Sequence, residues 1–407
     1  MNLLSQYRGL RRENYVLCFG RLVTAMGSLI WPMLTMILSQ KMGMGAEHIA
    51  WIIAAAGILS LPANLIGGRM ADSFNKKMNI IYLDIVSVTC YLICAVIPLS
   101  GISIVLMFIA STSQNMEHPS YNALAADLTT TEDRERGYSL QYLGANLGFV
   151  ISPMLAGYLF KDYLWLAFLI SASAIASSAV LIFFQVKDIT PVQDVGHNAQ
   201  YQAERKGVGL AAVLRENRII ILYVLAISGY HATYQMYSYL MPLDLAKIHG
   251  DSGAVIFGSI TSVNCVVVVL FTPLLTKMFQ GLSDPVKTIL GQTLLLAGFA
   301  VFLLFQGQIP FYYAAMTILT WGEIFSVLAE NPYLTKRMPA SHRGRINGLA
   351  AVVRIGIASV YQLVIGKVYE TASSVAAWST VLAIGGGFVL ICIMLAVKDR
   401  KVYKNLY

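Results

Sequence analysis

Twelve long apolar stretches dominate the sequence and limit what the chain can fold into. A helix needs about 20 mostly apolar residues to cross the hydrocarbon core of a bilayer. Stretches of this kind cover residues 15–39, 49–71, 78–98, 102–126, 137–160, 163–186, 219–243, 253–276, 286–306, 310–335, 346–367 and 375–397. Only 12% of the 407 residues are charged, against roughly a quarter in soluble domains. The sequence therefore predicts an all-α integral membrane protein with 12 transmembrane helices.

Basic residues are distributed unevenly over the segments that connect these stretches. If the N-terminus is cytoplasmic, the segments on the opposite side contain only four of the 29 Lys and Arg residues, namely Lys41, Lys161, Lys247 and Lys367. Cytoplasmic segments are the ones that carry an excess of Lys and Arg. We therefore predict that both termini are cytoplasmic, and the net charge of +8 requires no nucleic-acid partner. No Asn-x-Ser/Thr motif occurs in the sequence, which favours a bacterial inner membrane.

Several expected absences narrow the class. The first apolar stretch is long enough to span, so it does not resemble a cleavable signal. All five cysteines, Cys18, Cys90, Cys94, Cys265 and Cys392, lie within apolar stretches, which argues against a disulfide framework or a zinc site. No glycine loop of the ATP-binding type is present. We expect no enzyme activity, no cofactor and no metal.

The chain contains an internal repeat. Glu117-His118-Pro119 in the fourth stretch corresponds to Glu330-Asn331-Pro332 in the tenth, about half the chain away. Similar Arg-x-Arg loops follow at 134–136 and 343–345. The long polar connection at 187–218, which ends in a helix-like segment at 210–215, separates the two copies. We predict a six-helix half at 1–186, a cytoplasmic linker at 187–218 and a second half at 219–407.

The connection between the second and third stretches reads Gly68-x-x-x-Asp72-x-x-Asn75-Lys76-Lys77. Together with the repeat and the helix count, it resembles the signature of the major facilitator superfamily, with Asn75 in place of the usual glycine. The resemblance implies two halves that rock about a site near the membrane midplane. It also implies a cytoplasmic gate, made by Gly68, Arg69, Asp72, Lys76, Lys77 and Asp127. In this gate Gly68 packs closely, Asp72 faces a helix N-terminus and Lys76 pairs with Asp127. The alternative is that the basic residues only fix the orientation.

A second pattern lies in the fifth stretch. Gly144, Gly148, Pro153 and Gly157 occur at a spacing that resembles the signature of proton-driven drug antiporters, although Ser152 and Ala156 replace two of its glycines. Ordinary packing through small residues is the alternative. The resemblance favours export, and the two replacements leave the direction open.

Ionisable residues inside the membrane point to the chemistry, because each is costly there. Most that we identify lie on the first, fourth, seventh and tenth helices, and Arg354 is the exception; they are Arg21, Glu117, His118, His231, Glu323 and Glu330. Glu117 is the first candidate for proton coupling. Its face carries Gln114 and its surroundings favour the neutral carboxyl, although a structural pair with Arg21 is the alternative. Glu330 is the second candidate. Glu323 lies on the same face and nearer the midplane, where we expect it either to take part in proton coupling or to contact the substrate.

The seventh helix is rich in aromatic residues. Tyr230 and Tyr234 share one face, and His231 and Gln235 share the next. Together with Arg21, Trp31, Gln114, Trp321 and Arg354, they form the predicted substrate cavity. Aromatic walls with few polar groups suit an apolar or amphipathic ligand. We expect a monomeric, proton-coupled exporter of small organic compounds. A proton symporter for a small nutrient or peptide, or a lipid flippase, is the alternative. A receptor would need a signalling domain.

Overall fold

All twelve predicted stretches are helical in the computed structural model, which describes residues 9–128, 134–186, 210–279, 281–337 and 343–404. Some helical side chains, including that of Asp72, also lie outside the described set. The α-helices are α1 (Arg12–Met26), α2 (Ile30–Met36), α3 (Ala46–Ser73), α4 (Lys76–Val96), α5 (Gly101–Asp127), α6 (Arg134–Phe160), α7 (Leu164–Gln185), α8 (Leu210–Glu216), α9 (Arg218–Tyr234), α10 (Met236–His249), α11 (Gly253–Met278), α12 (Asp284–Leu304), α13 (Ile309–Arg337), α14 (Arg343–Thr371) and α15 (Ser374–Val402). The prediction of an all-α membrane protein is confirmed.

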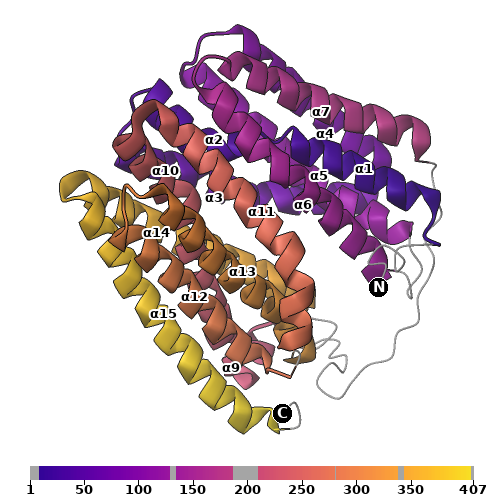
Figure 1. Cartoon of the computed structure of the whole chain (residues 1–407). Helices are drawn as coiled ribbons and strands as arrows, with labels where there is room; N and C mark the ends of the chain where they lie inside the picture. The colour runs from indigo at the N-terminus through magenta and orange to yellow at the C-terminus, as the bar shows by residue number, and fades with distance from the viewer. Residues whose placement is uncertain (1–8, 129–133, 187–209, 280, 338–342, 405–407) are drawn as a thin grey trace. The chain divides into compact units, whose positions relative to one another are not determined.

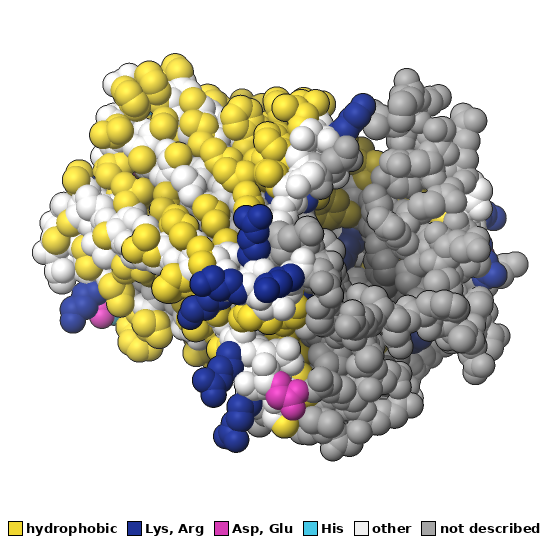
Figure 2. Space-filling view, turned by 90° about the horizontal axis from the view of Figure 1, so that it is seen from below, with side chains coloured by type: hydrophobic (Ala, Val, Ile, Leu, Met, Phe, Trp, Pro, Cys, Tyr) yellow, Lys and Arg dark blue, Asp and Glu magenta, His cyan; other side chains and the backbone are white. Residues whose placement is uncertain are grey.

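Ten helical runs within the described residues are long and apolar enough to cross a membrane. One of them, Arg218–Met278, contains two predicted spans, and α5 is not among the ten. Helix α5 falls short because its middle carries polar side chains, from Ser111 to His118. Large apolar side chains such as Val96 and Leu304 are 85% and 74% exposed, and hydrophobic side chains cover much of the described surface in Figure 2. This outward hydrophobicity is what contact with lipid requires.

The first predicted span is not one continuous helix. Helix α1 ends at Met26, residues 27–29 are not α-helical, α2 begins at Ile30, and a π-helical segment covers Ile37–Lys41. Pro32 has no N–H group, so it cannot donate a hydrogen bond to the carbonyl of Ser28. The seventh predicted span is also interrupted, at Gln235 between α9 and α10.

The chain forms two compact units (Figure 1). The first unit contains Met1–Gly43, Ile58–Val195 and Leu245–Val269, and the second contains Met44–Gly57, Gly196–Asp244 and Leu270–Tyr407. Helices α3 and α11 each contribute to both units. The predicted division into two six-helix halves with a linker remains a prediction, and of the linker only α8 and its neighbouring residues are described.

In the first unit, α1 and α4 both run antiparallel to α7. Arg12 bonds Gln185 and Gly27 lies against Ala174, while Lys77 bonds the carbonyl of Val186 and the ring of Tyr91 lies 6.2 Å from that of Phe168. Helix α5 runs antiparallel to α4, because Asn79 meets Ser120 and Ser87 meets Ala110. A buried cluster unites these helices around Leu17, Ile80, Tyr121, Leu124 and Ile182.

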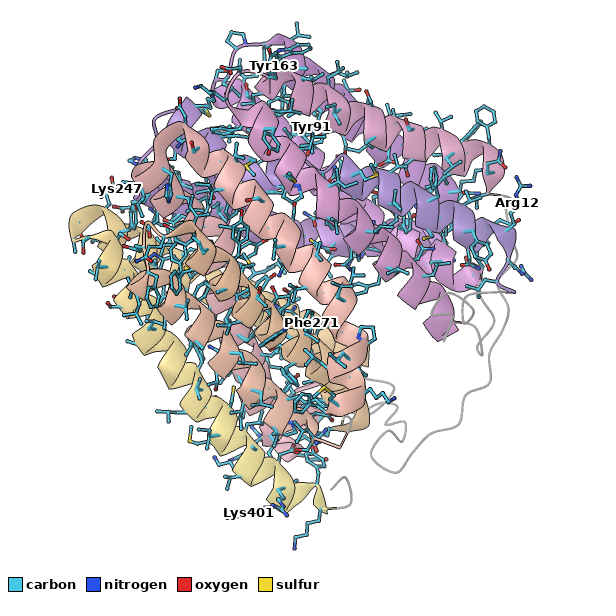
Figure 3. The ribbon with its side chains drawn as sticks, viewed as in Figure 1. Arg12, Tyr91, Tyr163, Lys247, Phe271 and Lys401 are labelled. Carbon is cyan, nitrogen blue, oxygen red and sulfur yellow. The ribbon has the colours of Figure 1, made fainter. Side chains whose placement is uncertain are left out.

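The first unit has two polar ends. At one end, Lys76 pairs with Asp127 and Asn14 donates to the carbonyl of Leu128. At the other, Lys161 pairs with Asp251 at 2.7 Å. Figure 3 labels Arg12 at the first end and Tyr163 near the second. The helices between these ends carry the residues of interest.

Glycines allow close helix crossings in the first unit. A Cβ atom on Gly144 would lie 2.8 Å from Cys18 Sγ, one on Gly148 would lie 2.5 Å from the carbonyl oxygen of Leu22, and one on Gly157 would lie 2.6 Å from that of Ala254. Helix α6 therefore packs on α1 and α11 through the predicted small-residue motif. The carbonyl of Pro153 likewise lies against Gly258.

The second unit is held by a buried polar cluster and an aromatic one. Asp244, 1% exposed, accepts hydrogen bonds from Trp378 Nε1, Tyr369 OH and Ser374 Oγ. The ring of Trp378 lies 5.0 Å from that of Phe299 and 5.1 Å from that of Phe302. These contacts join α10, α12, α14 and α15.

Candidate proton and substrate sites

Glu117 lies in the first unit and is nearly buried, at 9% exposure. It interacts electrostatically with Arg21 of α1. The Arg21 guanidinium lies over the ring of Tyr121, 4.6 Å from its centroid, and Tyr121 OH donates to the carbonyl of Leu17 at 2.6 Å. Arg21 thus lies near enough to Glu117 to interact with it electrostatically, and the contact with Tyr121 positions the guanidinium. Whether Glu117 couples protons or only pairs with Arg21 stays a prediction.

Asp84 of α4 belongs to the same group and is absent from the sequence prediction. It is 6% exposed and interacts electrostatically with both Glu117 and Arg21. The signal was present, because Asp84 is the one acidic residue within the apolar stretch 78–98. The sequence prediction concentrated on the first, fourth, seventh and tenth helices, whereas Asp84 lies on the third predicted span, α4.

His118 lies beside Glu117 in sequence but on another face. Its side chain is exposed. Its Nδ1 lies 3.1 Å from Asn122 Nδ2, within hydrogen-bonding distance.

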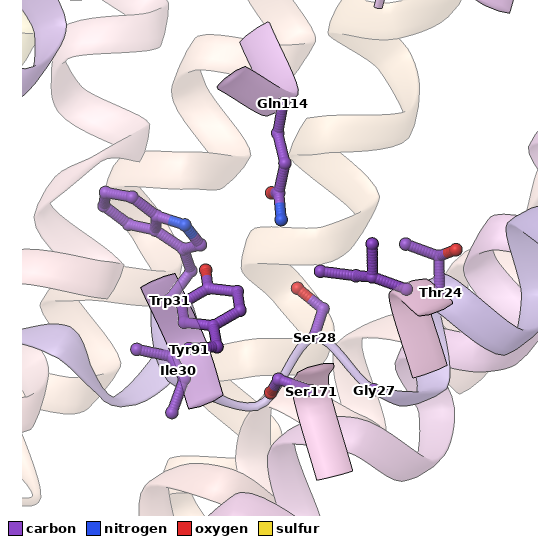
Figure 4. A pocket seen from close by; sticks show the side chains of 9 residues that line it. Thr24, Gly27, Ser28, Ile30, Trp31, Tyr91, Gln114 and Ser171 are labelled. Atoms are coloured by element: carbon purple, nitrogen blue, oxygen red, sulfur yellow. The ribbon is translucent and has the colours of Figure 1, made fainter. Parts of the chain in front are cut away.

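A small pocket lies at the break between α1 and α2 (Figure 4). Two predicted cavity residues, Trp31 and Gln114, line it together with Tyr91 and Ser28. The figure shows the Gln114 amide pointing toward the gap between Trp31 and Ser28. Because Ser28 belongs to the interrupted segment, the break in the helix forms part of the pocket wall.

The predicted gate residues are only partly described. Lys76 Nζ and Asp127 Oδ2 form an ion pair, and Lys77 Nζ donates to the carbonyl of Val186 at 2.7 Å. Arg69 is exposed, and the side chain of Asp72 lies outside the described residues.

Within the first unit, an added Cβ atom on Gly68 meets nothing within 4 Å, and the close approach expected of Gly68 between the two halves stays a prediction. The close contact within the first unit lies one residue earlier. The contact falls on Gly67, where an added Cβ atom would meet the backbone of Met116 of α5. The reason is geometric, because consecutive residues on a helix point in different directions, and α5 lies on the Gly67 side of α3.

The second unit contains a three-residue charge cluster. Glu330 Oε1 lies 3.2 Å from Arg354 Nη2, and Glu330 Oε2 lies 3.0 Å from His231 Nε2. Arg354 Nη1 is also 3.2 Å from His231 Nε2. Arg354 is therefore a charge partner of Glu330 in this structure.

Aromatic and amide side chains continue from this cluster. The rings of Tyr230 and Tyr234 stack with centroids 6.0 Å apart, and Gln362 Nε2 donates to Gln235 Oε1 at 3.0 Å. Glu323 interacts electrostatically with Tyr234. Trp321 lies apart from these residues, with its ring centroid 5.7 Å from that of Phe271.

Chemically, the two units differ in charge balance. In the second unit one carboxylate faces one guanidinium at ion-pair distance. In the first unit two carboxyls share one guanidinium. In the described residues, no group of three or more His, Cys, Asp and Glu side chains could hold a metal ion.

This fold, with its membrane-spanning helices and buried charged groups, defines a polytopic membrane transporter. The family model of the Major Facilitator Superfamily matches residues 17–361, and the chain belongs to this family. The family consists of transporters rather than enzymes, as the sequence predicted.

Three similar proteins illustrate the range of the family. A Na(+), Li(+), K(+)/H(+) antiporter of Planococcus maritimus is 22% identical over 352 residues, which are 80% of this chain and 81% of that protein. The multidrug resistance protein MdtH of Yersinia pestis (strain Pestoides F) is 23% identical over 262 residues, 63% of this chain and 61% of that protein. A crystal structure of the peptide transporter POT in complex with sulfate has a TM-score of 0.78 at 16% identity, with 97% and 95% of the two chains covered. This likeness shows the shared fold.

Proposed function

We propose that the protein is a proton-coupled antiporter that exports apolar or amphipathic organic compounds by alternating access. The observation that carries the proposal is the buried carboxyl of Glu117, which interacts electrostatically with Arg21. A carboxyl in apolar surroundings is easily neutralised by a proton. When the proton leaves, a nearby guanidinium stabilises the negative charge of the carboxylate. Antiport needs such a group, because proton and substrate must alternate.

The surroundings support an amphipathic substrate. The pocket at the helix break combines the indole of Trp31, the phenol of Tyr91 and the amide of Gln114. Such a lining offers aromatic faces beside hydroxyl, amide and indole N–H groups, a combination that suits an amphipathic ligand. The similarity to MdtH, a protein named for multidrug resistance, agrees with this substrate class.

Exchange of a monovalent cation for protons is the second candidate. The relative from Planococcus maritimus is named as an antiporter of this type. The specific observation in its favour is that two carboxyls, Asp84 and Glu117, interact with the single guanidinium of Arg21, because carboxylate oxygens are suitable ligands for hard cations.

We also propose a location and a gate. The protein resides in the inner membrane as a monomer with both termini in the cytoplasm, and the gate includes the pair Lys76–Asp127. The basic end of the first unit, which carries Arg12, Lys76 and Lys77, supports this orientation because cytoplasmic ends are rich in Lys and Arg.

The test is transport into everted membrane vesicles with an acidic lumen. Wild-type protein should accumulate amphipathic organic cations or neutral dyes, and uncouplers that collapse the pH gradient should abolish the uptake. Glu117→Gln, which keeps the size of the side chain and mimics its protonated form, should reduce gradient-driven uptake by roughly 100-fold or more, the range typical of proton-transfer groups.

Two controls make this test decisive. Asp162→Asn, which changes an exposed acid in the turn between α6 and α7, should transport normally. A parallel assay with Na⁺, Li⁺ or K⁺ as the only counter-substrate separates the two candidates. Unchanged uptake by Glu117→Gln would contradict the assignment of Glu117.

A further inference from the structure

Three charged residues of the first unit form one layer. Leu17, Ile80 and Tyr121 belong to a single buried cluster. Arg21 lies four residues after Leu17 on α1, Asp84 four residues after Ile80 on α4, and Glu117 four residues before Tyr121 on α5. Because α5 runs opposite to α1 and α4, each step is one helical turn in the same direction. The three charged side chains therefore stack directly on the same apolar layer.

Neither carboxyl of this layer has a close partner. Asp84 and Glu117 are 6% and 9% exposed, yet in the described residues neither accepts a hydrogen bond or forms a close ion pair. Both interact with Arg21 only at longer range. Glu330 differs, since its two oxygens contact Arg354 and His231.

The charges of the layer are unbalanced when both acids are ionised. Two carboxylates and one guanidinium leave a net charge of −1 in a buried setting, which is costly. One added proton brings the layer to neutrality, and a second would leave a net charge of +1. Two carboxyls that share a site accept a proton as a pair, because the ionisation of one disfavours that of the other.

We propose that Asp84 is a second proton-binding residue, and that Asp84 and Glu117 together bind one proton whose release leaves their negative charge beside Arg21. This inference rests on the proposed function, in which Glu117 carries the coupling proton. It assigns a stoichiometry of one proton to the first unit. The Glu330 cluster is already neutral with its carboxylate and guanidinium charged and His231 uncharged, so it needs no proton in this conformation.

The neighbouring titratable groups do not alter this balance. On α1, Cys18 donates through Sγ to the carbonyl of Leu140. On α5, Tyr121 donates to a backbone carbonyl, and His118 is exposed and within hydrogen-bonding distance of Asn122. From α7 the hydroxyl of Ser178 lies against Gly20 of α1, one residue before Arg21.

The experiment measures protonated carboxyl groups by infrared difference spectroscopy of the purified protein in lipid nanodiscs as a function of pH. Wild type should show one buried protonated carboxyl per molecule, whose signal disappears as the pH is raised. Asp84→Asn should remove this signal although Glu117 is still present, because Glu117 and Arg21 then balance each other without a proton. Glu117→Gln should do the same, and the double variant should show no further loss.

Asp162→Asn should keep the wild-type signal, and thermal unfolding of every variant checks that it folds. If Asp84→Asn keeps the wild-type titration, or if wild type shows two independent carboxyl signals of which each variant removes one, the shared proton is refuted. The measurement needs no transport, so failure of gradient-driven uptake in vesicles would contradict the proposed function and leave the spectroscopic result separate.

Discussion

Arg337 in the second unit shows how much one buried residue can hold together. It is 3% exposed, and its guanidinium contacts Asp399 at 2.7 Å and Asp284 at 3.3 Å while lying 4.0 Å from the ring centroid of Tyr333. Burial disfavours the charged guanidinium, but the hydrogen bonds to Asp399 together with the charges of Asp399 and Asp284 outweigh burial, so the pKa of Arg337 is raised. One side chain thereby joins the start of α12 to the ends of α13 and α15.

We expect Arg337→Gln to destabilise the protein strongly. The substitution leaves the carboxylates of Asp399 and Asp284 buried without their cation, and breaking a buried pair in this way costs roughly 3–5 kcal/mol. Thermal unfolding of the purified protein in detergent should show a clearly lower Tm. Arg400→Gln changes the exposed arginine that follows Asp399 in the sequence and should leave the Tm unchanged. Equal stability of the two variants would contradict the role of Arg337.

At the scale of helices, α4–α5 and α12–α13 are each joined by an ion pair between the start of the first helix and the end of the second, with the charges exchanged. Lys76 at the start of α4 pairs with Asp127 at the end of α5. Asp284 at the start of α12 pairs with Arg337 at the end of α13. The sequence repeat does not reveal this correspondence, because the positive and negative residues have exchanged helices.

The crossing of α6 on α1 makes a second prediction at this scale. Gly148→Leu should separate the two helices, since even a Cβ atom would lie 2.5 Å from the carbonyl of Leu22. Overpacking of this kind typically costs about 1–3 kcal/mol. The check is thermal unfolding, with Gly387→Leu as the control, because an added Cβ atom on Gly387 meets nothing within 4 Å. A normal Tm for Gly148→Leu would show that the crossing is not tight.

The sequence correctly predicts features that depend on one helix alone, such as the position of each membrane span. The length of apolar stretches predicted every long helix, because a span needs a fixed number of apolar residues. It failed where several helices act together. The partners of Arg337, the contacts of Asp244 and the layer of Asp84 with Glu117 depend on which faces meet. The interruption at residues 27–29 was also missed, although Gly27 and Pro32 are visible signals.

For the molecule as a whole, the distribution of charge over the two ends of the first unit supports the proposed orientation in the membrane. Lys401 follows the last long apolar stretch, and Lys161 lies in a turn at the opposite end from Lys76. All five native cysteines lie within helices, so they can be replaced to give a background for labelling. The proposed topology then becomes directly measurable.

In that background, Lys401→Cys should react with a membrane-impermeant maleimide only in everted vesicles, because the proposal places the C-terminus in the cytoplasm. Lys161→Cys should react only in intact spheroplasts. Labelling of both cysteines from the same side would contradict the odd number of spans that the proposal places between Lys161 and Lys401. Labelling with the sides exchanged would mean that the topology is inverted.

The polar middle of α5 has a consequence for how the protein is made. This helix is not apolar enough to count as a span by itself, and insertion into a bilayer depends on the summed apolarity of a segment. During synthesis α5 should leave the translocon only together with α4, as a hairpin in which Asn79 and Ser87 of α4 already meet Ser120 and Ala110. The residues that we propose to serve transport are thus the ones that make biogenesis depend on a neighbouring helix.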